Sequence, residues 1–189
     1  MAQNDTKVVT GKVRLSFVNV FDPRQNDNGQ DVWSASLLIP KSDKKTISAL
    51  NKAAANALRD GISSGKLKQN ASVKNAWTTL HDGDERDDVD ERPEYADHYY
   101  MNVSAYRKPS VVDRALHDIL DTSEVYSGCY ARVSINAYAY KSNGNTGITF
   151  GLNHVQKLAD GDFLGGRSRA EDDFDALDDE DEYEEDGLL

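Results

Sequence analysis

Three tyrosines and one arginine alternate with small apolar residues between positions 129 and 140. In a strand, successive side chains point to opposite faces, so all four would share one face. They are Tyr130, Arg132, Tyr138 and Tyr140. Flat rings stack on nucleic acid bases and cations attract phosphates, which together are the chemistry of single-strand binding. The pattern predicts such a surface, with each stacked base contributing about 1 to 3 kcal/mol whatever its identity.

Two other segments carry basic side chains in a similar alternation, and one of them adds tyrosines. One lies around positions 98 to 108, where tyrosines alternate with apolar residues, and the other opens the first strand-like segment. They add the candidate DNA-binding residues Lys12, Arg14, Tyr100, Tyr106, Arg107 and Lys108. A structural interpretation stays open, because tyrosine is a good strand former and packs against cross-strand neighbours.

Residues 171–189 hold twelve acidic side chains and no basic one. The formal net charge is −11, so residues 1–170 sum to +1. Dense like charge is typical of disordered interaction tails. Tethered to a cationic groove, the tail would compete with nucleic acid at an effective concentration of about millimolar. Its apolar residues would then serve a protein partner: Phe174, Leu177, Tyr183, Leu188 and Leu189.

A second acidic run, between positions 82 and 91, has seven acids and one base, Arg86, for a net charge of −6. Because residues 1–170 sum to +1, the other 160 residues before the tail carry +7. These carboxylates suggest one alternative function, a metal-dependent nuclease. Another alternative is an acidic adaptor or DNA mimic that touches only protein. The run fails the EF-hand spacing, because Arg86 and Pro93 stand where ligands are needed. Neither a P-loop nor Gly-x-Ser-x-Gly occurs, so we predict no catalytic residue, metal or cofactor.

The bulk properties indicate one cytoplasmic domain. Cys129 is the only cysteine, which rules out internal disulfides and favours a reducing compartment. We expect it in the core rather than as a nucleophile. No apolar stretch approaches the roughly 20 residues that span a bilayer, so no membrane partner is expected.

The periodicity predicts five strands and one helix. Strands are expected at 11–21, 31–39, 98–107, 129–140 and 147–153, with 129–140 the longest and an Asn-Gly hairpin turn after it. A helix at 43–60 would have Ser42 as N-cap and Gly61 as C-cap. Trp33 is expected in the core, and Trp77 to pin the long loop that follows the helix.

These elements suit a mainly β fold, a five-stranded OB-type Greek-key barrel with one helix inserted between strands. Residues 1–9 are expected to be a flexible N-terminus. Residues 10–168 would form the OB-fold domain, with 62–97 as a long insertion loop. Residues 169–189 would be a disordered acidic tail.

Three motifs are the specific part of a family resemblance that covers roughly residues 10–175: LLIPKSD, VYSGCYARV and ADGDFLGG. The chain resembles a family of tailed-phage OB-fold single-stranded DNA-binding proteins, first catalogued as uncharacterised and broadly similar to the T7-type phage protein. The resemblance implies a non-enzymatic protein that coats and protects single-stranded DNA during replication and recombination.

The resemblance also implies a location and a protein partner. The location is the cytoplasm of an infected bacterial host, and the tail would contact DNA polymerase or other replication proteins. T7-type tails end in phenylalanine, whereas this sequence ends in Gly187-Leu188-Leu189, so a pocket built for an aromatic would fit it poorly. The sequence leaves the oligomeric state open, a homodimer included.

Overall fold

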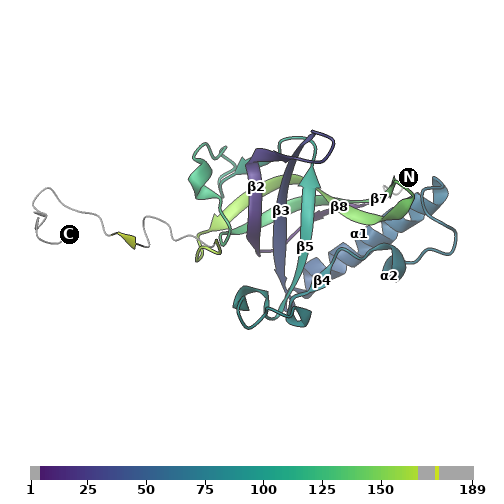
Figure 1. The fold of residues 1–189 in the computed structure, drawn as a ribbon, viewed down its shortest axis with the longest axis horizontal. Helices are drawn as coiled ribbons and strands as arrows, with labels where there is room; N and C mark the ends of the chain where they lie inside the picture. Colours follow the sequence, from purple (N-terminus) through teal and green to yellow (C-terminus); the bar gives the residue numbers. More distant parts are fainter. Residues whose placement is uncertain (1–4, 166–172, 175–189) are drawn as a thin grey trace, which may run out of the picture.

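The structure is a computed structural model that describes residues 5–165 and 173–174. Figure 1 shows β2, β3 and β5 side by side, with the long hairpin of β7 and β8 behind them and α1 lying against the hairpin. The strands are β1 (Lys7–Val9), β2 (Val13–Gln25), β3 (Asp31–Pro40), β4 (His81–Asp82), β5 (His98–Ala105), β6 (Ser110–Val112), β7 (Tyr130–Ser142) and β8 (Asn145–Ala159). The helices are α1 (Lys44–Ser63) and α2 (Val73–Ala76), with single 3-10 turns η1 (Gly83–Glu85), η2 (Pro93–Tyr95) and η3 (Thr122–Glu124).

Five strands close into a barrel in the order β7, β2, β3, β5, β8 and back to β7. All these pairings are antiparallel except that of β5 with β8, which run parallel and meet at Ser104 and Gly151. This is the Greek-key arrangement of an OB-fold, so the predicted fold class is confirmed. The short strands β1, β4 and β6 join the edges, which raises the described sheet to eight strands.

The barrel interior is filled by the apolar side of each strand. On β7 the odd-numbered side chains from Ala131 to Ala139 are buried, as the alternation predicts, and Cys129 is fully buried just before the strand begins. Trp77 is also buried and lies 5.4 Å from the Phe150 ring, so it pins the segment after α1 as expected. Apolar area removed from water stabilises the fold by about 25 cal/mol per Å².

The helix and the N-terminal segment differ from the predictions. Asp43, not Ser42, caps α1 through its side chain, and the helix runs on to Ser63 with Ser64 as C-cap. Gly61 is not a cap, because it is a helical residue against which Leu67 and Ala139 pack. Lys7–Val9, expected to be flexible, pairs with β7 as β1.

The segment 62–97, predicted as one long loop, contains α2, β4 and two 3-10 turns. β4 pairs with β5, which lays the second half of the segment over the outer face of the barrel. Gly83 permits this, since a Cβ there would meet the Tyr95 carbonyl oxygen at 2.1 Å. Tyr95 is 2% exposed, and its ring contacts Tyr100 of β5 and the guanidinium groups of Arg86 and Arg92.

Strand lengths and two side-chain positions complete the comparison. β8, with 15 residues, is longer than β7, which was expected to be the longest strand. Asn143 and Gly144 have φ of 50° and 81°, as the predicted Asn-Gly turn requires. Trp33 is only half-buried and lies outside the main core. Most of the predicted tail, including Tyr183, Leu188 and Leu189, lies outside the described residues, whereas Phe174 is described and exposed.

Candidate nucleic-acid interface

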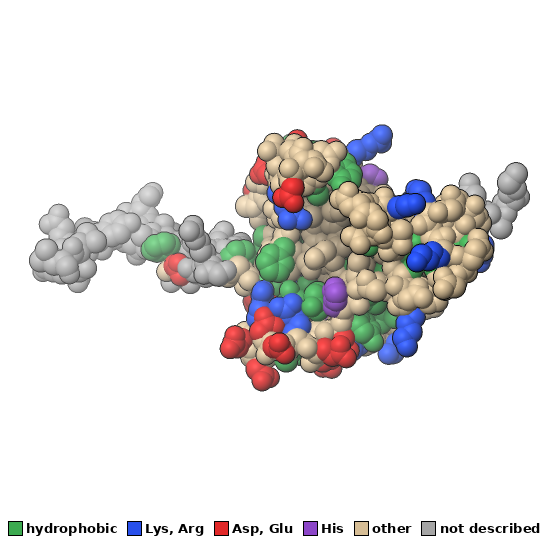
Figure 2. Space-filling view, turned by 45° about the vertical axis from the view of Figure 1, so that its right-hand side comes forward, with side chains coloured by type: hydrophobic (Ala, Val, Ile, Leu, Met, Phe, Trp, Pro, Cys, Tyr) green, Lys and Arg blue, Asp and Glu red, His purple; other side chains and the backbone are tan. Residues whose placement is uncertain are grey.

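A groove of about 610 Å³ crosses the outer face of β2, β3 and β5. Its floor is made of short polar side chains that β3 and β5 present on the same face: Ser34, Ser36, Asn102 and Ser104. Figure 2 shows this face hollowed at its centre, with hydrophobic and basic side chains along one rim and acidic ones beyond them. In OB-folds, the face formed by the second and third barrel strands is the one that binds oligonucleotides. Those strands here are β3 and β5.

One end of the groove is a cluster of stacked rings around Arg86. The Arg86 guanidinium lies 4.1 Å from the Tyr95 ring centre and 5.2 Å from that of Tyr100. Tyr100 also contacts Tyr95 edge-on at 5.0 Å and the His81 ring at 5.1 Å. Asp88 accepts two hydrogen bonds from Arg86, at 2.7 and 2.8 Å, which fixes the guanidinium plane.

Phe17 stands beside this cluster in an unusual backbone conformation. Its φ is 47° and its side chain is 60% exposed, although β2 alternation would turn it inward. An extra residue between Ser16 and Asn19 breaks the register with β3 and reverses the facing of the strand. Left-handed backbone in a bulky residue costs about 1 to 3 kcal/mol and clusters at functional sites. The strained position therefore suggests that the exposed ring has a role in binding.

The acidic run contributes mainly ion pairs rather than a metal site. Lys41 Nζ lies 2.6 Å from a carboxylate oxygen of both Asp82 and Asp84. The hydrogen bond from Lys41 lowers the pKa of Asp84, and the hydrogen bonds from Arg86 lower that of Asp88. Among residues 5–165 and 173–174, no three metal-binding side chains gather. Three of the seven carboxylates, those of Asp82, Asp84 and Asp88, thus pair with the protein's own cations.

Several predicted residues lie on or beside β5, or on β7 opposite a β8 residue of the groove wall. Tyr100 lines the groove, and Tyr106, Arg107 and Lys108 are exposed just beyond the last residue of β5. Tyr138 is 44% exposed, and its cross-strand partner Thr149 lines the groove. Burial raises the pKa of the Tyr138 hydroxyl, and Tyr106 nearby adds to the shift. The structure thus places aromatic rings at both ends of the polar floor.

The other predicted residues have structural partners elsewhere. The Lys12 ammonium sits 4.7 Å above the Tyr130 ring. Arg14 donates hydrogen bonds to the carbonyl oxygens of Gly128 and Asp162, at 3.1 and 2.8 Å.

Arg132 and Tyr140 also serve local packing. Arg132 donates two hydrogen bonds to Gln156 Oε1, at 3.0 and 2.7 Å, and the Tyr140 ring lies over Gly147. None of Lys12, Arg14, Tyr130, Arg132 and Tyr140 is among the described residues that line the groove.

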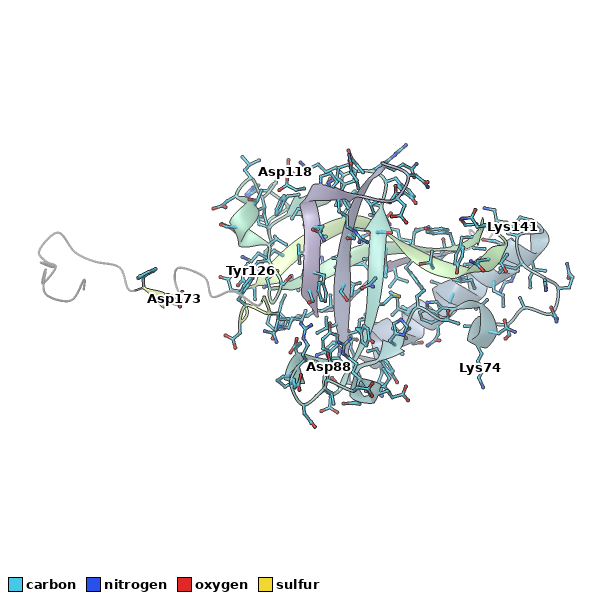
Figure 3. All side chains as sticks on the ribbon, in the orientation of Figure 1. Lys74, Asp88, Asp118, Tyr126, Lys141 and Asp173 are labelled. Carbon is cyan, nitrogen blue, oxygen red and sulfur yellow. The ribbon has the colours of Figure 1, made fainter. Side chains whose placement is uncertain are left out.

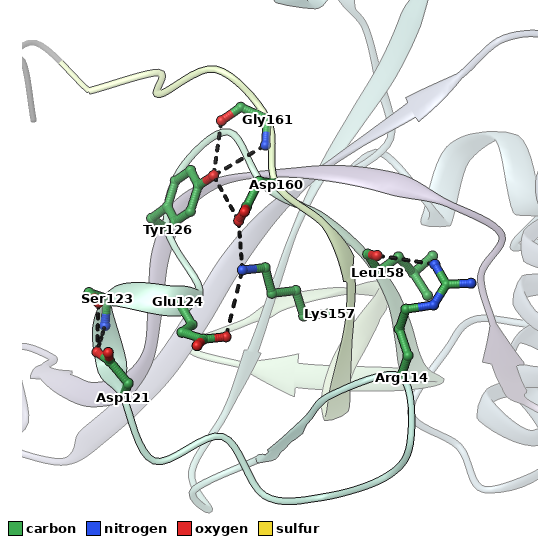
Figure 4. Close-up of polar contacts among 9 residues, drawn as sticks. All are labelled: Arg114, Asp121, Ser123, Glu124, Tyr126, Lys157, Leu158, Asp160 and Gly161. Carbon is green, nitrogen blue, oxygen red and sulfur yellow. Dashed lines mark hydrogen bonds and ion pairs between the residues drawn. The ribbon is translucent and has the colours of Figure 1, made fainter. Parts of the chain in front are cut away.

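The segment after β8 is fastened to the body by a polar network (Figure 4). The Tyr126 hydroxyl bonds Asp160 Oδ1 at 3.2 Å and the Gly161 carbonyl oxygen at 3.0 Å. Lys157 Nζ lies 2.7 Å from the same Asp160 oxygen. The Leu164 amide then donates to the Ser127 carbonyl oxygen at 2.9 Å.

These contacts place the residues that follow β8, Leu164 and Gly165, beside the groove. Leu164 and Gly165 line a smaller hollow, of about 370 Å³, together with Phe17 and Arg92. Because Phe17 also lines the groove, the two hollows share one side chain. The last described residues of the body therefore lie beside the aromatic end of the groove.

The side chains that sequence reasoning missed include Phe17, Asn19, Arg24, Arg86 and Tyr95 in the groove and Arg92 in the smaller hollow. Arg86 had one available signal, as the single base within an acidic run. Phe17 had none, since its outward facing depends on a bulge that the alternation does not show. Tyr95 reaches the groove, and Arg92 the smaller hollow, only because the insertion folds back over β5.

Comparison with known proteins identifies relatives of this chain. A family model described as "Enterobacter phage Enc34, ssDNA-binding protein" matches residues 6–185. "Putative protein p50" of Acyrthosiphon pisum secondary endosymbiont phage 1 is 30% identical over 183 residues, covering 90% of this chain and 94% of that protein. The family resemblance stated from the motifs is thus confirmed.

Solved structures show the same fold. The single-stranded DNA-binding protein from bacteriophage Enc34, in complex with ssDNA, superimposes with a TM-score of 0.70 at 19% identity. That match covers 85% of this chain and 90% of the other. The single-stranded DNA-binding protein gp2.5 of bacteriophage T7 gives a TM-score of 0.55 at 13% identity, over 88% of this chain and 99% of that one.

Proposed function

This chain belongs to the Enterobacter phage Enc34 single-stranded DNA-binding protein family, and from that premise we propose that it binds single-stranded DNA, whatever its sequence, in the β3–β5 groove. The observation that supports this most is the groove itself, a polar floor with the rings of Phe17, Tyr95 and Tyr100 at one end and the exposed Tyr138 ring beside it. Stacking on such rings tolerates every base, because each base has a π-face. Binding alone protects the strand, so no catalytic step is needed.

Three arginines supply the phosphate contacts in this proposal. Arg24 and Arg86 line the groove, and Arg92 lines the adjoining hollow. Arg86 and Arg92 are already paired with Asp88 and Glu94, so their net charge is partly offset. We therefore expect a moderate dependence of affinity on salt rather than the steep one of a fully cationic channel.

A titration of fluorescent oligo-dT at two salt concentrations tests the proposal, with duplex of equal length as the control. We expect the single strand to bind far more tightly than the duplex, because duplex bases are not free to stack. Equal affinity for both, or no binding to oligo-dT, would refute it.

We also propose that residues 171–189 compete with DNA for the groove. Two facts support this: the twelve acids of the segment, and the position of Leu164 and Gly165 beside Phe17 and Arg92. A full-length variant with Asn and Gln in place of these acids should bind oligo-dT more tightly, above all at low salt. Unchanged affinity at low salt would argue against competition.

Once displaced, the segment is proposed to recruit replication or recombination proteins such as DNA polymerase in the cytoplasm of the infected bacterium. Phe174, which is 75% exposed, supports this role as an apolar contact. Polymerase activity on a primed single strand coated with wild-type or Phe174→Ala protein tests it. The variant should coat the DNA equally but stimulate synthesis less.

A further inference from the structure

The net positive charge of the body is concentrated away from the groove, at the end formed by α1 and α2. Between positions 44 and 74 there are seven basic residues and one acid, Asp60. We call these seven the basic end: Lys44, Lys45, Lys52, Arg59, Lys66, Lys68 and Lys74, all exposed. The segment has a net charge of +6, which is most of the +7 carried by the body outside 82–91.

The basic end lacks the features of a single-strand platform. The exposed large apolar side chains of the described residues all lie outside positions 44–74. Without rings, bases have nothing to stack on, although a polyanion without bases would still be attracted. Lys45, Lys52 and Arg59 recur every seven residues, which aligns them along one side of α1 at intervals of about 10 Å.

We propose that the basic end binds the acidic segment 171–189 of a second copy of this chain. The charges are complementary, +6 against −12. The inference rests on the proposed function, since DNA in the groove displaces the segment and leaves it available to a neighbour.

The layout of the molecule favours a neighbour over the same chain. Figure 3 shows Lys74 and Lys141 at one end of the body and Tyr126, which anchors the segment after β8, at the other. Figure 2 shows basic side chains over the α1 and α2 end, with acidic ones gathered elsewhere on that face. Copies arranged head to tail along one strand would bring each acidic segment to the basic end of the next. Binding to the same strand raises the effective concentration of the two partners.

Cooperative binding is the measurable consequence. The test variant is K45E/K52E, in which glutamate keeps the helix propensity at both positions and, at position 45, suits the first turn of α1. The control K45R/K52R retains both charges. Each protein is titrated with an oligo-dT that holds one copy and with long poly-dT.

We expect K45E/K52E to bind the oligonucleotide as the wild type does and to lose at least about tenfold in cooperativity on poly-dT. The full-length variant with a neutral 171–189 segment should lose the same factor, and combining the two changes should lose no more. Unchanged cooperativity in K45E/K52E would overturn the proposal. If the combined variant lost more cooperativity than either change alone, the proposal would also be overturned. The basic end would then act through something other than segment 171–189, namely DNA.

Cross-linking tests the contact directly and separately from DNA affinity. Equal amounts of ¹⁴N- and ¹⁵N-labelled full-length protein on poly-dT are treated with a carbodiimide, which joins lysines to carboxylates. Mixed-isotope peptides that join Lys45 or Lys52 to 171–189 support the proposal, and single-isotope peptides alone overturn it. If neither the wild type nor the variants bind oligo-dT, the proposed function is refuted. The same cross-linking carried out without DNA would still test the contact between the basic end and segment 171–189.

Discussion

The guanidinium of Arg92 lies 5.7 Å from the centre of the Phe17 ring. This contact joins the insertion to the first barrel strand across one end of the groove. Arg92 is also 5.4 Å from the Tyr95 ring and pairs with Glu94 at 2.9 Å, so both strand and insertion hold it in place. The aromatic end of the groove is therefore preorganised in the protein without DNA.

Phe17→Ala should weaken oligo-dT binding by about 1 to 3 kcal/mol, the contribution of one stacked base. Because the ring is 60% exposed, the loss should appear in affinity rather than in the melting temperature. Fluorescence titration measures the first and calorimetry the second. Leu120→Ala, at an 89% exposed position outside the groove, is the control and should change neither.

Arg24→Gln should flatten the dependence of oligo-dT affinity on salt. Removal of one phosphate contact lowers the slope of log K against log salt by about 0.7 for a single strand. Titrations at four salt concentrations give the slope. Lys74→Gln removes an equal charge from α2, away from the groove, and a similar flattening there would show a general charge effect instead.

Tyr138 and Tyr130 share one face of β7 but should respond differently to alanine. Tyr138 lies next to the groove, so Tyr138→Ala should reduce oligo-dT affinity by about 1 to 3 kcal/mol. Tyr130 packs against Lys12 and Gly161, so Tyr130→Ala should lower the free energy of unfolding and leave oligo-dT affinity within about twofold. A greater loss of DNA affinity in Tyr130→Ala would extend the interface along the β7 face to Tyr130.

Gly128→Ala should destabilise the protein more than Gly29→Ala, although both glycines have positive φ, of 119° and 75°. A Cβ at position 29 meets nothing within 4 Å, so only the backbone strain of about 1 kcal/mol applies. At position 128 it would meet the Asp162 carbonyl oxygen at 1.9 Å, adding at least about 2 kcal/mol. Urea unfolding compares the two, and equal losses would contradict the described packing.

Cys129 should resist alkylation until the barrel opens. It is fully buried, and burial raises the pKa of its thiol, so at pH 8 less thiolate exists than in an exposed cysteine. Raising the pH increases the thiolate fraction until the pH has passed that raised pKa. The rate of reaction with a thiol reagent at pH 8 should follow the unfolding rate across a urea series. Fast labelling without urea would place the thiol near the surface.

The sequence predicts the barrel well where one rule decides the outcome. On β7, alternation alone separates buried from outward positions, and Asn143-Gly144 defines the hairpin register. Helix ends are predicted less well, because Gly61 is kept by its packing against Leu67 and Ala139 rather than by a cap. Local propensity contains no information about such a tertiary contact.

The candidate site was predicted by chemistry more than by position. Tyr100 lines the groove as expected, whereas Arg14 holds backbone carbonyl oxygens of a segment nearly 150 residues later in the sequence, at Asp162. The bulge at Phe17 and the fold of the insertion depend on contacts between distant segments. Periodicity within one strand could not show which aromatic rings would meet.

β8 joins β5 through the single parallel pair of the barrel, Ser104 with Gly151, so the groove is complete only once β8 is in place. β2, β3 and β5 can pair with one another as they emerge during synthesis, but Thr149 of the groove wall comes from β8. Contacts between residues so far apart form slowly, because a long loop must close first. The last strand to be synthesised therefore completes the surface, and a chain interrupted before β8 would leave an open sheet edge in its place.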